Sequence, residues 1–111
     1  MTLSHPSRDQ IRIEHVLAAL GNSTRLGAVR ILDGAGDFNC TGVLNALGVK
    51  AKSTMTHHWR VLREAGIIRQ TPVGREYLVE LRRTDLDERY PGLLDTVLAA
   101  ERVDSPPPAS E

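Results

Sequence analysis

The sequence predicts a mainly α-helical domain with one small β-hairpin, in the order α-α-α-α-β-β-α. Two observations carry this prediction. Apolar residues recur at helical spacing before residue 66 and after residue 90, and glycines or capping residues bound these stretches. Between them lie two short extended segments, separated by a proline and a glycine, as in β-hairpins.

The length and composition predict one domain with an aliphatic core. The chain has 111 residues, and only 4% of them are aromatic. We expect the folded domain to occupy residues 1–104. The tail, residues 105–111, contains three consecutive prolines and is expected to be disordered.

The first helix is predicted from a cap and an apolar stripe. Ser7 and Gln10 have the spacing of a capping box, and Gly21 ends the helix. The apolar stripe of this helix is Ile13, Val16, Leu17 and Leu20.

Two further helices precede the fourth. Asn22 or Ser23 caps the second, which runs to about Leu32. Asn39 caps the third, which is short and ends at Gly48. The third helix and the one that follows it are joined by a tight turn, which is typical of a helix-turn-helix.

The fourth helix is predicted to begin near Ser53 and to end at Gly66. Met55, Trp59 and Leu62 recur at i, i+4 and i+7 and therefore point inward. The opposite face carries hydrogen-bonding side chains, namely Ser53, Thr56, His57 and Arg60.

The hairpin is predicted from residues 67–70 and 77–81, with the turn at residues 71–74. Tyr77, Val79 and Leu81 alternate onto the core, and Arg75 lies beside the turn. Pro91 suits the first turn of a last helix. The apolar residues of that helix are Leu93, Leu94, Val97, Leu98 and Val103.

The formal charges balance over the whole chain but are segregated along it. Residues 50–83 hold eight Lys or Arg against three Glu, whereas residues 84–111 hold two Arg against seven acidic residues. The basic segment coincides with the fourth helix and the hairpin, which favours nucleic acid as a partner. A merely solvated basic face is the alternative.

Several classes of protein are disfavoured. The chain has no long apolar run and no signal-peptide pattern, so we expect a cytoplasmic protein without membrane contact. Its single cysteine, Cys40, cannot form an internal disulfide. We expect no enzyme, because phosphate loops, spaced nucleophile and base pairs and paired zinc-binding motifs are absent.

The residues that we predict to contact DNA form one group. His57 and Arg60 suit base edges, the hydroxyl residues suit phosphates or base edges, and Arg75 suits a phosphate or the minor groove. For His58, a structural role beside Trp59 and a DNA contact both remain open. The predicted DNA-binding residues are Lys52, Ser53, Thr54, Thr56, His57, His58, Arg60 and Arg75.

Residues 54–68, Thr-Met-Thr-His-His-Trp-Arg-Val-Leu-Arg-Glu-Ala-Gly-Ile-Ile, resemble the recognition-helix signature of the ArsR/SmtB family of winged helix-turn-helix bacterial transcriptional regulators. Residues 20–26 are similar to that family's entry into its second helix, and residues 74–77 to its wing. Trp59 departs from the aliphatic residue usual there. The resemblance spans roughly residues 11–100.

The resemblance implies a homodimer joined through the first and last helices, which presents two recognition helices to successive major grooves of an inverted-repeat operator. The apolar stripes of both helices support this pairing, although a monomer that buries both stripes internally is an alternative. The predicted interface residues are Ile13, Val16, Leu17, Leu94, Val97 and Leu98.

The resemblance also raises the question of a metal effector. By this resemblance, the positions of the family's cysteine pair correspond to Asn39 and Thr41, so a thiolate site is not supported. His5 and His15, with carboxylates from a partner's last helix, are weak candidates for Ni(II), Co(II) or Zn(II). An oxidation switch at Cys40 is a weaker alternative, since no second cysteine resolves it.

The sequence therefore predicts a dimeric, sequence-specific, DNA-binding transcriptional regulator of the ArsR/SmtB type. Repression is the family's default, and a divalent metal such as nickel or zinc, or a co-regulator protein, is a candidate effector. The alternative is a winged-helix module that binds another protein without reading DNA.

Overall fold

The computed structural model describes residues 3–35, 37–48 and 52–104, and within these it describes only the backbone of residues 35, 37–41, 44, 52 and 53. Helices dominate, with one antiparallel hairpin, which confirms the predicted fold class. The elements, in order, are the short 3-10 helix η1 (Arg8–Gln10), α1 (Ile13–Leu20), α2 (Ser23–Ala35), β1 (Asp37–Asn39), α3 (Cys40–Leu47), α4 (Lys52–Glu64), β2 (Ile68–Val73), β3 (Glu76–Leu81), α5 (Arg83–Arg89) and α6 (Leu93–Asp104).

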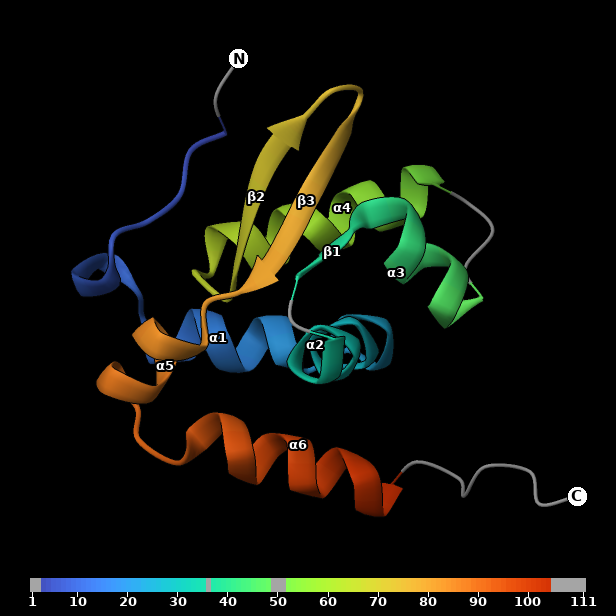
Figure 1. The fold of residues 1–111 in the computed structure, drawn as a ribbon. Helices are drawn as coiled ribbons and strands as arrows, with labels where there is room; N and C mark the ends of the chain where they lie inside the picture. Colours follow the sequence, from blue (N-terminus) through green and yellow to red (C-terminus); the bar gives the residue numbers. More distant parts are fainter. Residues whose placement is uncertain (1–2, 36, 49–51, 105–111) are drawn as a thin grey trace, which may run out of the picture.

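Helices α1 and α2 form the middle of the molecule. The β2–β3 hairpin, α3 and α4 lie on one side of them, and α6 lies on the other, as Figure 1 shows. Helix α2 contacts α1, α3, α4 and α6, so it is the centre of the packing. Fully buried side chains from different elements meet there, among them Val29, Val43, Leu62 and Val79.

Two helix ends are fixed as the sequence indicates. Asn22 Oδ1 accepts the backbone N–H groups of Thr24 and Arg25 at 3.0 and 3.1 Å, which satisfies two free donors of α2. Gly66 follows α4 with a φ of 85°, a conformation that other residues adopt only with strain. The chain can therefore turn sharply from α4 into β2.

The first predicted helix is shorter than its cap suggested. Ser7 donates its backbone N–H to Gln10 Oε1 at 2.9 Å, but this cap serves only the 3-10 turn η1. Ile11 and Arg12 are extended, and α1 begins at Ile13. The expected helix start at Ser7 is thus replaced by a short turn and an extended segment.

The hairpin is longer than predicted. Strand β2 pairs with β3 from Ile68 opposite Leu81 to Val73 opposite Glu76, so the turn consists of Gly74 and Arg75. Pro72, expected in the turn, lies within β2. This strand lies at the edge of the sheet that the described residues form, and an edge strand tolerates proline.

Besides η1, the described residues form a strand and a helix that the predicted order does not contain. The three-residue strand β1 pairs with β3 and makes the hairpin a three-stranded sheet of order β1-β3-β2. Helix α5 follows β3 directly and precedes Pro91, which therefore lies between two helices. Within the described residues, no helix combines the length and apolar character needed to cross a bilayer.

Candidate nucleic-acid interface

Helix α4 has one buried face and one exposed polar face. Met55, Trp59 and Leu62 are buried, which confirms the predicted inward stripe. Thr54, Thr56, His57 and Arg60 are exposed. The helix therefore offers hydroxyl, imidazole and guanidinium groups on a surface whose underside is fixed in the core.

The hairpin turn adds a second exposed cation. Arg75 follows Gly74, whose φ of 62° allows the tight connection between β2 and β3. Lys52 and Ser53 lie in the first turn of α4, but their side chains fall outside the described residues. The backbone places both at the start of the exposed helix.

His58 is buried, unlike its neighbour His57. Its side chain faces α2, where the Arg25 Nη1 atom lies 3.2 Å from His58 Nδ1. Since a guanidinium has only donors, the imidazole nitrogen must accept this bond. Burial, followed by the charges of Arg25 and His57, lowers the pKa of His58, so the ring is neutral at physiological pH.

Arg25 ties three helices together. Besides the bond from α2 to His58 of α4, its Nε atom donates to the carbonyl oxygen of Ala19 at 2.6 Å and its Nη2 atom to that of Ala18 at 3.4 Å, both in α1. Sequence reasoning did not assign this residue a role. A signal was present, because Arg25 lies on the same helical stripe as the buried Val29 and Leu32.

A second tie joins α4 to the sheet. Arg63 Nη1 donates to Gln70 Oε1 at 2.8 Å, and the backbone N–H of Gln70 donates to His5 Nε2 at 3.0 Å. Arg82 Nη1 donates to the carbonyl oxygen of Pro6 at 2.7 Å. The N-terminal segment is thereby fastened to β2 and to the start of α5.

The two histidines named as weak metal candidates have different surroundings. Burial and the charges of Arg69, Arg63 and Arg82 lower the pKa of His5, and its Nε2 atom already accepts a bond. This environment disfavours a cation at His5. His15 is exposed on α1. Among the described residues of one chain, no three His, Cys, Asp or Glu side chains gather as a metal site would require.

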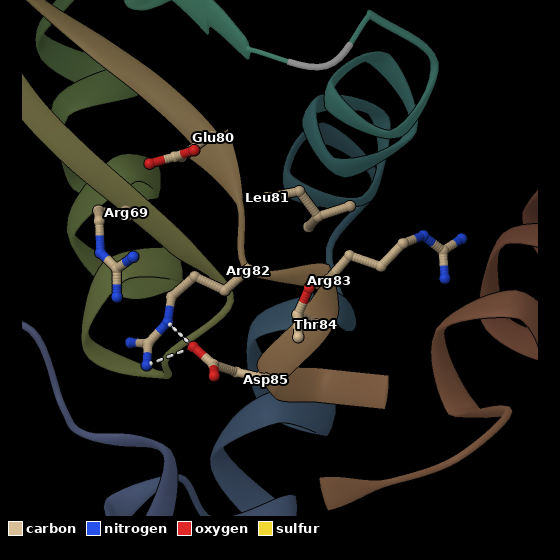
Figure 2. A pocket seen from close by; sticks show the side chains of 7 residues that line it. All are labelled: Arg69, Glu80, Leu81, Arg82, Arg83, Thr84 and Asp85. Carbon is tan, nitrogen blue, oxygen red and sulfur yellow. Dashed lines mark hydrogen bonds and ion pairs between the residues drawn. The ribbon is translucent and has the colours of Figure 1, made fainter. Parts of the chain in front are cut away.

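An open, polar pocket lies at the base of the hairpin, with a volume of about 260 Å³. Figure 2 shows Arg82 turned toward Asp85 and the guanidinium of Arg83 directed away from Arg69. Arg83 is paired outside the pocket with Asp33, Asp87 and Asp95. Two of the three arginines that line the pocket are therefore occupied by carboxylates of the chain itself.

The predicted dimer-interface residues divide into two groups. Ile13 and Leu17 on α1 are 38% and 51% exposed, and Val97 on α6 is half-buried. The interior of the chain, rather than a partner, covers Val16, Leu94 and Leu98. Val103, another apolar residue of the last helix, is 83% exposed. Exposed apolar side chains thus occur on both the first and the last helix.

The chain is similar in sequence to a known protein. The chain is 33% identical over 92 residues to the uncharacterized HTH-type transcriptional regulator YceK of Bacillus subtilis (strain 168), with 82% of this chain and 90% of YceK covered. No protein-family model matches the chain.

Solved structures agree in fold. Reduced HlyU from Vibrio cholerae N16961 has a TM-score of 0.64 at 17% identity, covering 85% of this chain and 90% of HlyU. A crystal structure of an ArsR family transcriptional regulator has a TM-score of 0.62 at 16% identity, covering 90% of this chain and 94% of that one. YceK and the ArsR family protein are transcriptional regulators, a class of protein that is not enzymatic. The relative shows that the chain belongs to the helix-turn-helix (HTH-type) transcriptional regulators, and its fold is similar to that of an ArsR family regulator.

Proposed function

We propose that this regulator acts as a homodimer that reads an inverted repeat in double-stranded DNA with α4 and the hairpin. The observation that carries the proposal is the exposed polar face of α4, held over a buried apolar underside in the most basic part of the chain. An α-helix of this kind fits the major groove, where base edges present distinct donor and acceptor patterns.

The exposed side chains divide by the chemistry of their DNA partners. His57 and Arg60 are proposed to read base edges, with Arg60 suited to the two acceptors of guanine. Thr54, Thr56 and Ser53 contact phosphates or base edges, and Lys52 contacts a phosphate. Arg75, at the tip of the hairpin, contacts a phosphate or enters the minor groove.

The dimer is proposed to form through the outer faces of α1 and α6. Ile13 and Leu17 expose apolar surface on α1, and Val97 contributes the half-exposed part of α6. A two-fold axis would bury the same patch on both subunits. The two copies of α4 then lie about 34 Å apart, one turn of DNA, so that both enter the same groove.

Repression by promoter occupancy, relieved by an effector, completes the proposal. A divalent ion such as Ni(II), Co(II) or Zn(II) remains a candidate at His15, with carboxylates of the partner's last helix as further ligands. A co-regulator protein is the other candidate. Either would act by changing DNA affinity through a coupling of about 1–3 kcal/mol.

The direct test is selection of bound duplexes from a random-sequence library, followed by gel retardation with the purified protein. We expect an inverted repeat with half-sites one turn apart, and an affinity that falls steeply with salt as counterions return to the phosphates. A winged-helix module that binds only proteins would enrich no sequence and would bind its partner with little dependence on moderate salt.

A further inference from the structure

The contact between Arg25 and His58 lies on the hidden side of the recognition helix. His58 is 9% exposed, and it follows directly on His57, which belongs to the exposed face. Arg25 reaches it from the first turn of α2 while also binding the carbonyl oxygens of Ala18 and Ala19 at the end of α1. One side chain thus fixes α4 to both helices beneath it.

This contact depends on the protonation state of the imidazole. Nδ1 can accept from Arg25 only while it carries no proton, so the ring must be neutral with its proton on Nε2. A proton on Nδ1 would remove the acceptor and place two cations side by side in a buried position. The charged and titratable groups that face His58 are Arg25 from α2 and His57 from its own helix.

We propose that Arg25 and neutral His58 form the positioning contact that holds α4 in its DNA-reading orientation, and that protonation of His58 releases it. The proposal rests on the function proposed above. Base-edge hydrogen bonds tolerate errors of only about 0.5 Å and 10–20° in the supporting element. A small rotation of α4 therefore displaces Arg60 and His57 from their partners without unfolding the domain.

The proposal and simple electrostatics predict opposite effects of acid on the affinity for DNA. Acidification adds positive charge to exposed histidines, which alone strengthens binding to phosphates. Release of α4 instead weakens binding to the selected sequence as the pH falls. The two effects are separated by comparing a selected duplex with a random-sequence duplex of the same length.

The experiment measures fluorescence anisotropy of both labelled duplexes between about pH 7.5 and pH 5.5, with circular dichroism to show that the protein stays folded. For the wild type, we expect the Kd of the selected duplex to rise on acidification, by less than about tenfold because one proton is linked and the pKa of His58 lies below 6.5. The Kd of the random duplex should stay level or fall.

Two substitutions make a matched pair. His58→Gln keeps an acceptor for Arg25 and cannot titrate, so its ratio of Kd values at the two pH values should stay within about twofold. His15→Gln removes an exposed imidazole on α1, outside the proposed DNA-reading face, and its ratio should follow that of the wild type. An equal acid loss in His58→Gln, or no acid loss in the wild type, would overturn the proposal.

A measurement without DNA separates this proposal from the proposed function. Nuclear magnetic resonance of the free protein follows the His58 ring and the backbone amides of α4 during the same titration. We expect the α4 amides to shift together with the His58 ring in the wild type, and Arg25→Met to raise the pKa of His58 by removing a neighbouring charge. The proposed contact is contradicted if the α4 amides do not shift during the titration. It is also contradicted if Arg25→Met leaves the His58 titration unchanged. Both outcomes can be observed even if no duplex binds.

Discussion

The imidazole of His5 closes the free edge of the sheet by accepting the backbone N–H of Gln70 at 3.0 Å. Among the described strands, β2 has β3 on one side only, so its outward N–H groups need other partners. The bond requires an unprotonated Nε2 atom on His5. The N-terminal segment is therefore held by a group that loses its acceptor in acid.

Acid should destabilise the fold through His5 and His58. Burial and neighbouring arginines lower the pKa of both histidines below the ordinary value of 6.5, so the unfolded chain binds more protons than the folded one. The free energy of unfolding should fall as the pH drops through 6.5 and continue to fall until the lowered folded pKa values are passed. Urea unfolding at several pH values across this range measures the free energy of unfolding.

The control for this acid effect is His15→Gln, since His15 is exposed on α1. It should leave the pH dependence of unfolding unchanged, whereas His58→Gln should flatten it. The interpretation fails if the stability of wild type and His58→Gln changes equally between neutral and mildly acid pH.

Gly66→Ala should destabilise the protein by about 3 kcal/mol, because left-handed strain and overpacking add. Gly66 has a φ of 85°, and a Cβ atom there would lie 2.5 Å from Cγ1 of the buried Ile11. Gly74→Ala is the matched control, with a φ of 62° and no atom within 4 Å of the added carbon. It should cost only about 1 kcal/mol by chemical unfolding, from strain alone. Equal costs would contradict the proposed crowding against Ile11.

Arg60→Ala and Arg75→Ala should weaken DNA binding in different ways. Arg60 is exposed on α4 and is proposed to read a base, so its loss should cost about 1–3 kcal/mol on the selected duplex and less on random DNA. Arg75 lies at the hairpin tip, and its loss should weaken both complexes. Competition titrations with both duplexes measure the ratio of the affinities for selected and random DNA. If Arg60→Ala keeps the full preference for the selected sequence, Arg60 is not the base reader.

Leu17→Glu should convert the proposed dimer into a monomer that remains folded. Leu17 is half-exposed, so a carboxylate there is solvated in the monomer but desolvated in a dimer. Sedimentation velocity reports the mass, and circular dichroism reports the fold. Val73→Glu, at an exposed site on β2, should leave the mass unchanged. A dimer that persists in Leu17→Glu would exclude this face of α1 from the interface.

Arg83→Met should loosen the attachment of α6. Arg83 pairs with Asp33 of α2 at 2.9 Å, with Asp95 of α6 at 2.8 Å and with Asp87 of α5 at 3.2 Å. The hydrogen bond to Asp33 raises the pKa of Arg83, as do those to the other two carboxylates. Arg83 is therefore charged at every accessible pH.

Because the Arg83 side chain is 35% exposed and screened by solvent, we expect a loss of only about 1 kcal/mol in low salt and less in high salt. The control is Arg12→Met, which removes a local pair with Glu14. It should leave the unfolding midpoint unchanged. If Arg83→Met lowers the free energy of unfolding equally at both salt concentrations, the lost stability comes from packing rather than from charge.

Local sequence determined the two faces of α4 and the ends of several helices. Met55, Trp59 and Leu62 repeat at helical spacing, so any packed helix with this sequence buries them together and exposes Thr56, His57 and Arg60. Asn22 caps α2 through bonds to residues two and three positions away. Such interactions span a few residues and need no knowledge of the rest of the chain.

The tertiary structure alone decided what each apolar stripe and each buried polar group meets. Strand β1 exists through pairing with β3, some forty residues away in the chain, and His58 is a tie rather than a surface group because Arg25 arrives from α2. Val16 and Leu94 are buried while Ile13 and Leu17 are exposed, although all four are apolar. Periodicity gives the direction of a side chain around its own helix, but its burial depends on which distant element packs there.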